Sequence, residues 1–261
     1  MTFIRHELRQ GRLAFWIWTS VIAFMMAVCI FLFPEMKGQM DGFDEVFSSM
    51  GAFTDAFGMD QLNFGTFIGY YAIECGNVIG LGGAFFAALC GVGILSKEER
   101  NGTAEFLLTH PVSRVRIVTD KLIAVFIQVV AQALILYVIC IGSIAVIGED
   151  IPWKEITLLH FAYLLLQIEL TSICFGISAF LRKGSVGVGL GVAMLMYFMN
   201  LTANITEAAE GLKYITPYGF TDGADIVSNG CLDVTMVLIG MGFALLGVVV
   251  AYRKYCTKDI R

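Results

Sequence analysis

The stretch LAFWIWTSVIAFMMAVCIFLF, from Leu13 to Phe33, contains 21 residues and no charged side chain. The hydrocarbon core of a bilayer is about 30 Å thick and a helix rises about 1.5 Å per residue, so a run of this length can cross it. The arginines that precede it resemble the start of a signal peptide. However, the apolar region of a signal peptide is usually only about 7–15 residues long, and no small-residue cleavage site follows Pro34. We therefore predict a retained transmembrane helix.

Five further stretches have the length and apolar character of membrane spans. They are Phe67 to Leu95, Leu122 to Ile147, Ile156 to Leu181, Val186 to Ile205 and Val234 to Tyr252. The whole chain of 261 residues is 57% hydrophobic and 15% charged, against about 45–50% and 25% in a soluble domain. The sequence predicts an all-α membrane protein with six transmembrane helices and a single domain over residues 1–261. Its net charge of −5 offers no basic surface for nucleic acid.

The basic residues indicate the topology, because short loops rich in lysine and arginine stay in the cytoplasm. With the N-terminus inside, all but three of the 17 basic residues fall in cytoplasmic segments, and the exceptions are Lys37, Lys154 and Lys213. We predict that both termini are cytoplasmic. A long cytoplasmic loop, residues 97–121, then joins spans two and three, and a tight one surrounds Arg182 and Lys183.

The outer segments are not featureless. In residues 34–66 apolar side chains recur near helical spacing between acidic ones, which is typical of an amphipathic helix. Such a helix could pack on the outer ends of the spans or form a lid that faces substrate. Thr206 to Leu232 carries Pro217, Gly219, Gly223 and Gly230 among apolar residues, which fits short broken helices dipping into the membrane or a surface loop.

The sequence contains no pattern typical of a catalytic or metal centre. Seven cysteines show no C-x-x-C spacing and lie mostly in apolar runs, where cysteine behaves as a small hydrophobic residue. His6, His110 and His160 are scattered over both sides of the membrane and are interpreted as loop or interfacial residues. We expect no catalytic residue, no disulfide and no metal ligand.

Several polar residues lie inside the predicted spans. A charged carboxylate facing lipid would cost about 2.5 kcal/mol or more, so these groups should face protein or water. They either line a substrate path or make hydrogen bonds between helices. The residues are Glu74, Asn77, Gln128, Gln132 and Glu169.

The most informative segment is KEERNGTAEFLLTHPVSRVRIVTDK, residues Lys97 to Lys121. Span two should continue through Glu98 and end at Asn101-Gly102, a pair that tolerates left-handed backbone. Thr103 can cap a short helix from Ala104 to Thr109, with Glu105 near its N-terminal dipole. Pro111 ends that helix, and Ser113 can cap the next. The short helix would expose Phe106, Leu107 and Leu108, which need a partner surface.

This loop resembles that of the permeases of ABC-2-type transporters, in which a similar pattern lies between the second and third spans. The matching residues are Glu98, Gly102, Thr103, Glu105, Leu107, Leu108, Pro111, Val112, Ser113, Arg114, Ile117 and Lys121. The segments YITPYGFTDG (214–223) and YRKYCTKDIR (252–261) are also similar to that family. The resemblance implies that the loop is a coupling helix, which docks into a cytoplasmic ATPase and transmits its closure to a dimer of permeases, with export as the expected direction.

The chain contains no Gly-Lys dipeptide, hence no phosphate-binding loop of the Walker A type. It should therefore not be an enzyme, and ATP and magnesium should bind to a separate ATPase subunit. The expected partners are that ATPase, a second permease chain that is identical or paralogous, and the bilayer of a bacterial inner membrane. Arg182 and Lys183 would form a second cytoplasmic contact. The N-terminal segment FIRHELRQGR would be an interfacial helix that either touches the ATPase or only anchors the chain.

Other functions fit the same hydropathy. A proton-coupled secondary transporter would use Glu74 and Glu169 and would need no ATPase, although no internal inverted repeat is visible. An intramembrane enzyme is disfavoured, because neither H-E-x-x-H nor G-x-S-x-G occurs. A structural or sensor subunit without transport activity could keep the same coupling loop.

Overall fold

The computed structural model describes residues 2–38, 51, 54, 62–102, 112–181 and 186–258. Six of the helices in these ranges are long and apolar enough to cross a membrane, as predicted. In chain order the elements are α1 (Thr2–Lys37), α4 (Phe67–Tyr70), the π-helical turn η2 (Tyr71–Cys75), α5 (Gly76–Val92), α6 (Lys97–Asn101), α8 (Arg114–Ile147), α9 (Trp153–Ser178), α10 (Val186–Ile205), the 3-10 helices η3 (Glu207–Tyr214) and η4 (Gly219–Thr221), α11 (Gly223–Asn229) and α12 (Val234–Thr257).

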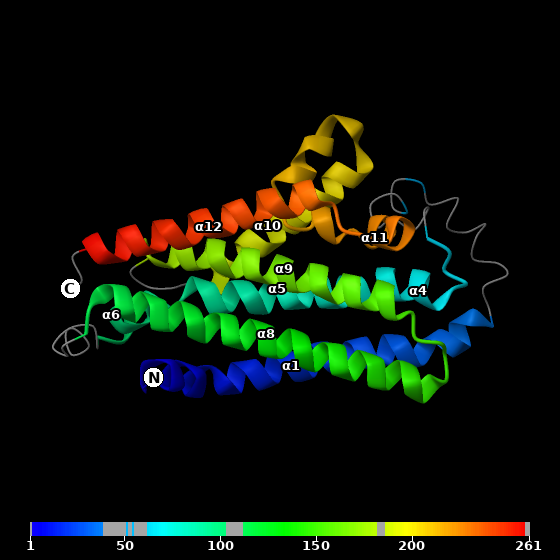
Figure 1. Ribbon diagram of the computed structural model, residues 1–261, viewed down its shortest axis with the longest axis horizontal. Coiled ribbons are helices and arrows are strands. Elements are labelled where there is room, and N and C mark those ends of the chain that lie inside the picture. The colour runs from blue at the N-terminus through cyan, green and yellow to red at the C-terminus, as the bar shows by residue number, and fades with distance from the viewer. Residues whose placement is uncertain are drawn as a thin grey trace.

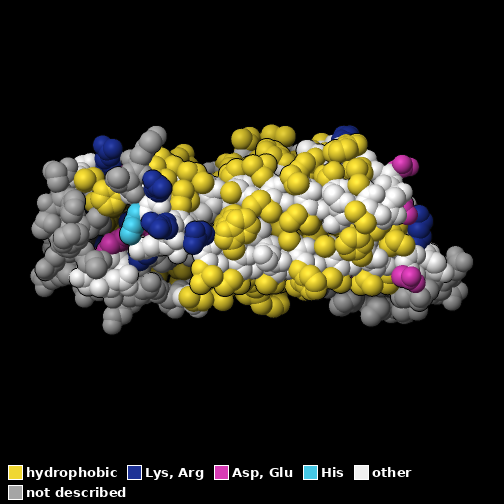
Figure 2. Space-filling view, turned by 90° about the horizontal axis from the view of Figure 1, so that it is seen from below, with side chains coloured by type: hydrophobic (Ala, Val, Ile, Leu, Met, Phe, Trp, Pro, Cys, Tyr) yellow, Lys and Arg dark blue, Asp and Glu magenta, His cyan; other side chains and the backbone are white. Residues whose placement is uncertain are grey.

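The long helices form a layered bundle (Figure 1). Helices α1 and α8 pack along each other, α5 and α9 form the central pair, and α12 and α10 cover α9 and α5 respectively. Both ends of the chain lie at one end of the bundle, together with α6. We call this the basic end. Figure 2 shows an apolar belt along the bundle, with lysine and arginine side chains gathered toward the basic end.

The first and third spans continue beyond their apolar stretches. Helix α1 runs without a break from Thr2, so the predicted interfacial segment is the first part of the spanning helix, and Pro34 lies inside its last turn. Helix α8 begins at Arg114. The hydroxyl of Ser113 accepts a hydrogen bond from the Arg116 N–H at 3.3 Å. The predicted Ser113 cap is confirmed, and it brings Arg114, Arg116 and Lys121 into one continuous helix.

The second span is less regular than predicted. It begins as α4, passes through the π-helical turn Tyr71–Cys75 and continues as α5 to Val92. Residues 93–96 form a turn, and α6 follows as a separate helix. The prediction that span two runs unbroken through Glu98 is wrong. Near the break, Ser178 of α9 accepts a hydrogen bond from the Leu95 N–H at 3.0 Å, which a continuing helix would have used within itself.

Glycines set the distance from α9 to α12 and from α9 to α5. A Cβ atom at Gly176 of α9 would lie 2.7 Å from the Gly247 carbonyl oxygen of α12, and one at Gly247 would collide with the carbonyl of Ser172. On the other side, a Cβ atom at Gly76 would lie 2.6 Å from the Tyr163 hydroxyl oxygen. Small residues thus bring the backbones into contact, which is how helices associate where lipid removes the hydrophobic driving force.

A buried polar contact at the end opposite the basic end corrects one prediction. His160 is 8% exposed, and its Nε2 atom lies 2.8 Å from the hydroxyl oxygen of the fully buried Tyr71. The π-helical turn supplies Tyr71, and Cys140 of α8 donates its S–H to the same hydroxyl at 3.1 Å. His160 is therefore a buried helical residue that joins two helices, which contradicts its interpretation as a loop residue.

The segment before the last span consists of short helices. Its middle part, Thr216 to Thr221, is buried, and η4 packs against α9 and α12 while α11 packs against η2 and α9. The hydroxyl of Thr216 donates to the Met196 carbonyl of α10 at 2.9 Å. Short broken helices are confirmed, and burial excludes a surface loop for Thr216 to Thr221, whereas most described residues of η3 are exposed. Insertion of this segment into the membrane stays a prediction. The predicted amphipathic segment 34–66 lies largely outside the described residues.

We predict that Gly247→Ala lowers the free energy of unfolding by about 1–3 kcal/mol, because the added methyl group forces α12 away from α9. The measurement is unfolding of the purified protein in detergent. Gly242→Ala is the matched control, since Gly242 lies on the same helix and no atom of the described part of the chain lies within 4 Å of its Cβ position. Equal stability of the two variants would contradict this account of the α9 and α12 contact.

Candidate functional site

The candidate site is the basic end of the bundle, where the chain enters and leaves residues 103–111. Helix α6 has only five residues and ends at Gly102, whose φ of 67° lies in the left-handed region. The Gly102 N–H donates to the Glu99 carbonyl at 3.3 Å. The predicted helix end at Asn101-Gly102 is confirmed. So short a helix is unstable alone, and its position depends on contacts with other elements.

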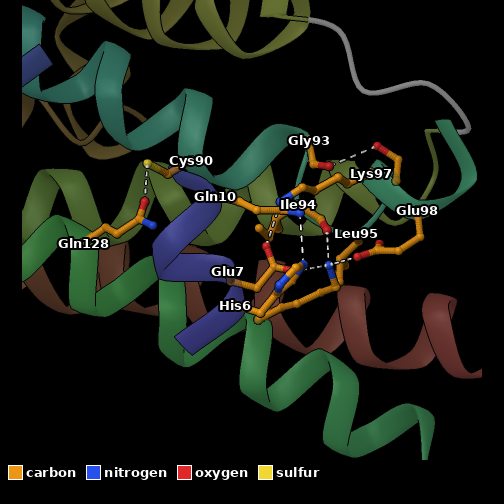
Figure 3. Close-up of polar contacts among 12 residues, drawn as sticks. His6, Glu7, Gln10, Cys90, Gly93, Ile94, Leu95, Lys97, Glu98 and Gln128 are labelled. Atoms are coloured by element: carbon orange, nitrogen blue, oxygen red, sulfur yellow. Dashed lines mark hydrogen bonds and ion pairs between the residues drawn. The ribbon is translucent and has the colours of Figure 1, made fainter. Parts of the chain in front are cut away.

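The first contact is a buried ion cluster around Lys121 of α8. Figure 3 shows three of its other members, Glu7, Lys97 and Glu98. The Lys121 ammonium is 3% exposed and lies 2.9 Å from the Glu7 carboxylate of α1 and 2.5 Å from the Glu98 carboxylate of α6. It also donates to the Ile94 carbonyl at 2.8 Å. Glu7 is 5% exposed, and its second oxygen accepts from the Lys97 ammonium at 2.9 Å. Two carboxylates and two ammonium groups thus join α1, α6 and α8.

The second contact comes from the residue that follows α12. The Lys258 ammonium lies 2.8 Å from the Glu99 carboxylate of α6 and donates to the Leu181 carbonyl, just after α9, at 3.1 Å. Both side chains of this ion pair are mostly buried. Glu98 and Glu99 therefore anchor α6 to different helices, one toward α1 and α8 and the other toward α12.

The chain that leaves residues 103–111 is also anchored. The Arg114 guanidinium donates to the carbonyls of Tyr255, Cys256 and Lys258, the last at 2.6 Å. These carbonyls are at the C-terminal end of α12, where a helix has unpaired acceptors and a partial negative charge. Both flanks of residues 103–111 are thus fixed to α12, one through Lys258 and the other through Arg114.

The energetics of the cluster indicate a rigid junction. Removing an ammonium or carboxylate from water costs several kcal/mol per ion, and close opposite charges offset that cost only while the pairing is complete. Removing one partner from such a cluster typically costs about 3–5 kcal/mol. Helix α6 therefore cannot shift away from α1, α8 and α12 without a large loss of free energy.

The described residues contain part of the predicted coupling site. Glu98, Gly102, Ser113 and Arg114 lie together at this junction. The rest of the predicted contact surface lies outside the described residues and stays a prediction. Those residues are Thr103, Glu105, Phe106, Leu107, Leu108, Pro111, Arg182 and Lys183.

The polar residues predicted for a substrate path do not come together. Gln132 donates to the Thr19 hydroxyl of α1 at 3.5 Å, and Gln128 accepts from the Cys90 thiol of α5 at 3.5 Å. Glu169 points elsewhere, since a Cβ atom at Gly240 of α12 would collide with its carboxylate. Gln128 lines a cavity of about 320 Å³ near the basic end, together with Glu7 and Lys97.

The other two members of this set lie toward the opposite end. The Asn77 amide donates to the Ile73 carbonyl at 2.9 Å, and its oxygen accepts from the Tyr197 hydroxyl of α10 at 3.3 Å. Glu74 belongs to the π-helical turn and is partly exposed. The five residues are therefore distributed over different helix pairs and both halves of the bundle.

Four charged residues of the junction were missed by the sequence analysis, namely Glu7, Lys97, Glu99 and Lys258. A signal existed for Glu7, because it is the one acidic residue in the basic segment FIRHELRQGR. An acidic residue among arginines near a membrane surface indicates an ion pair with a buried cation. The sequence could not show which cation.

Six long apolar helices define a multi-pass membrane protein, and a charged junction at one end of the bundle holds α6 and the start of α8. A sequence model of the family described as ABC-2 family transporter protein matches residues 1–260. The chain belongs to this family and is a membrane component of ABC transport, a component that is not itself catalytic. Among curated proteins, no sequence matches the chain.

We predict that Lys121→Met lowers the free energy of unfolding by about 3–5 kcal/mol, because it leaves Glu7 and Glu98 buried without their shared cation. The control is Lys37→Met, which removes a cation that is 51% exposed and pairs with Glu149 at 2.8 Å. Exposed pairs contribute about 0–1 kcal/mol. Chemical unfolding in detergent measures both variants, and equal losses would contradict the buried cluster.

A second prediction concerns Glu169, which is 0% exposed and has no hydrogen-bond partner for either carboxylate oxygen among the described residues. Glu169→Gln should leave stability unchanged or increase it, since it replaces an ionisable group by a neutral one of similar shape. It should also leave transport intact. Loss of transport with normal folding would instead favour proton coupling through this residue.

Proposed function

We propose that the chain is the permease subunit of an ATP-driven exporter and that residues 97–121 dock a separate cytoplasmic ATPase. The observation that carries the proposal is the double attachment of this loop. Ion pairs at Glu98 and Glu99 hold its first part, and Arg114 holds the chain that follows. A loop that only connected two spans would not need buried charges from three other helices.

The attachment suggests how movement would be transmitted. An ATPase that closes on ATP displaces the docked loop, and the displacement reaches α6. Because the ion pairs of Lys121 and Lys258 would cost several kcal/mol to break, α6 should move together with α1, α8 and α12. Displacement of one short helix would thus become a displacement of whole spans.

A second permease chain would complete the pathway in this proposal. Apolar side chains on the outer surfaces of α1, α10 and α12 are exposed, and a bilayer or a second permease would cover them. In α10, no atom of the described residues lies within 4 Å of a Cβ position at Gly191, which leaves room for another helix to approach. The second chain is either another copy or a paralogue.

The experiment is mild purification of the tagged protein from its native membrane and identification of every chain that comes with it. A stoichiometric ATPase supports the proposal, and a second permease of different sequence would show a heterodimer. Isolation of the chain alone, under conditions that preserve other ABC complexes, would contradict ATPase docking.

We predict that the double variant Leu107→Ser/Leu108→Ser loses the co-purifying ATPase at least tenfold, because it removes the apolar contact expected in the ATPase groove. Its thermal unfolding midpoint should stay within a few degrees of the parent protein. Tyr214→Ser is the matched control, since Tyr214 is an exposed apolar residue at the opposite end of the bundle. Retention of the ATPase by the double variant would contradict the role of these leucines.

A further inference from the structure

A second candidate site lies at the end of the bundle opposite the coupling loop. It is a cavity of about 60 Å³ between α5, α9, α10 and the chain that enters α11. By volume it admits a small group and not a large molecule. Tyrosine and asparagine side chains from three different helices line it, which is unusual polarity for a space between membrane spans.

Two lining side chains are buried and incompletely satisfied. Asn200 of α10 is 9% exposed and Tyr218 is 5% exposed. Among the described residues, neither the Asn200 Oδ1 atom nor the Tyr218 hydroxyl has a hydrogen-bond partner. A buried polar group without a partner costs about 1–3 kcal/mol, so two of them in one cavity point to a ligand that supplies hydrogen bonds.

The charge of the residues that line the cavity indicates whether the ligand is a cation or an anion. Among the described residues that line it, Asp222 is the single charged one. One oxygen of Asp222 accepts from the Ala224 N–H at 2.9 Å and caps α11, and the other accepts from the Asn204 amide at 3.4 Å. Neither donor carries a positive charge. The carboxylate is therefore hydrogen-bonded but not neutralised, which disfavours an anion and favours a cation.

Aromatic rings surround the same space. Tyr163 of α9, Tyr197 of α10 and Tyr218 all line the cavity, and the rings of Tyr197 and Tyr218 meet edge to face with centroids 5.3 Å apart. The face of an aromatic ring attracts cations. Tyrosine hydroxyls can also accept hydrogen bonds from a cation that carries N–H groups.

We propose that this cavity binds a primary ammonium group. Such a group carries three N–H donors, and the cavity offers three acceptors that can receive them, at Asn200 Oδ1, the Tyr218 hydroxyl and the Asp222 carboxylate. The inference goes beyond the proposed function, because binding to the permease chain alone requires neither ATP nor an ATPase.

Close packing between the elements that line the cavity fixes its shape. The π-helical turn contributes Ala72 and Ile73 to its wall, and the start of α11 lies directly on that turn, since a Cβ atom at Gly223 would be 3.0 Å from the Ala72 carbonyl oxygen. Asn77 is held by Tyr197 at 3.3 Å. A preformed site loses little conformational entropy on binding. π-Helical turns occur frequently at functional sites.

The chemistry predicts a definite selectivity. Ethylammonium should bind, whereas tetramethylammonium, which has the charge but no N–H donor, should leave the acceptors of Asn200 and Tyr218 unsatisfied and bind more weakly. Ethanol, which is neutral, should not bind measurably. An ammonium group could reach the cavity on a soluble amine or on the headgroup of phosphatidylethanolamine.

The experiment uses the full-length protein, purified in detergent, with ethylammonium chloride as the probe. Calorimetric titration and the thermal unfolding midpoint are measured at constant ionic strength. We expect saturable binding and a rise in the midpoint, with binding by tetramethylammonium at least tenfold weaker. Absence of saturable binding, or equal binding of the two cations, would overturn binding of a soluble amine, and the comparison of lipids in nanodiscs then decides whether the headgroup of phosphatidylethanolamine is the ligand.

Three variants make the assignment specific. Asp222→Asn keeps an oxygen that can cap α11 but removes the charge, so it should weaken ethylammonium binding at least tenfold. Tyr218→Phe should weaken it severalfold. Asp225→Asn removes an exposed carboxylate from the same short helix, outside the cavity, and should bind as the parent does. Equal effects of Asp222→Asn and Asp225→Asn would overturn the assignment.

Nanodiscs distinguish the two sources of the amine. If the lipid headgroup occupies the cavity, phosphatidylethanolamine raises the unfolding midpoint above that in phosphatidylglycerol, added ethylammonium raises it no further, and Asp222→Asn abolishes the difference. If a soluble amine is the ligand, the midpoint is the same in both lipids and ethylammonium raises it in each. No rise from either the lipid or the amine contradicts the site.

Discussion

A lysine ammonium that is only 3% exposed constrains the basic end of this protein. Lys121 can remain charged there only if carboxylates replace the water it has lost. Glu7 and Glu98 do so from helices on either side, and the Ile94 carbonyl completes the set of acceptors. The need of this ammonium group for acceptors determines where α6, the turn before it and the first turns of α1 lie.

The same requirement explains why the second span breaks before the loop. Helix α5 ends at Val92, before the two acidic residues that pair with Lys121 and Lys258. The turn at residues 93–96 redirects the chain, so that Glu98 meets Lys121 while Glu99 meets Lys258 on the far side. Two adjacent acids thus serve two separate cations. Arg114 adds a third attachment at the end of α12, where free carbonyls favour a cation.

The features that could be predicted from the sequence are local ones. A span needs only its own apolar residues, and the ends at Gly102 and Ser113 depend on the backbone of one turn. The ion pairs are different, because Glu7 is 114 residues from Lys121 and Glu99 is 159 residues from Lys258. Helical periodicity shows which face carries a charge but not which helix that face meets. The same limit applies to Glu169, whose neighbour Gly240 has no side chain to suggest a contact.

The two candidate sites lie at opposite ends of the bundle, yet two packed helices reach both. Helix α5 contributes Asn77 to the polar cavity, and the turn at residues 93–96 connects it to α6. Helix α9 contributes Tyr163 to the cavity and holds the turn before α6 through Ser178. The two helices are in close contact, since a Cβ atom at Gly91 of α5 would lie 2.5 Å from the Thr171 carbonyl oxygen of α9. Displacement of the junction would therefore move this pair as one body and change the cavity at its other end, which gives a physical route between the loop and a bound ammonium group.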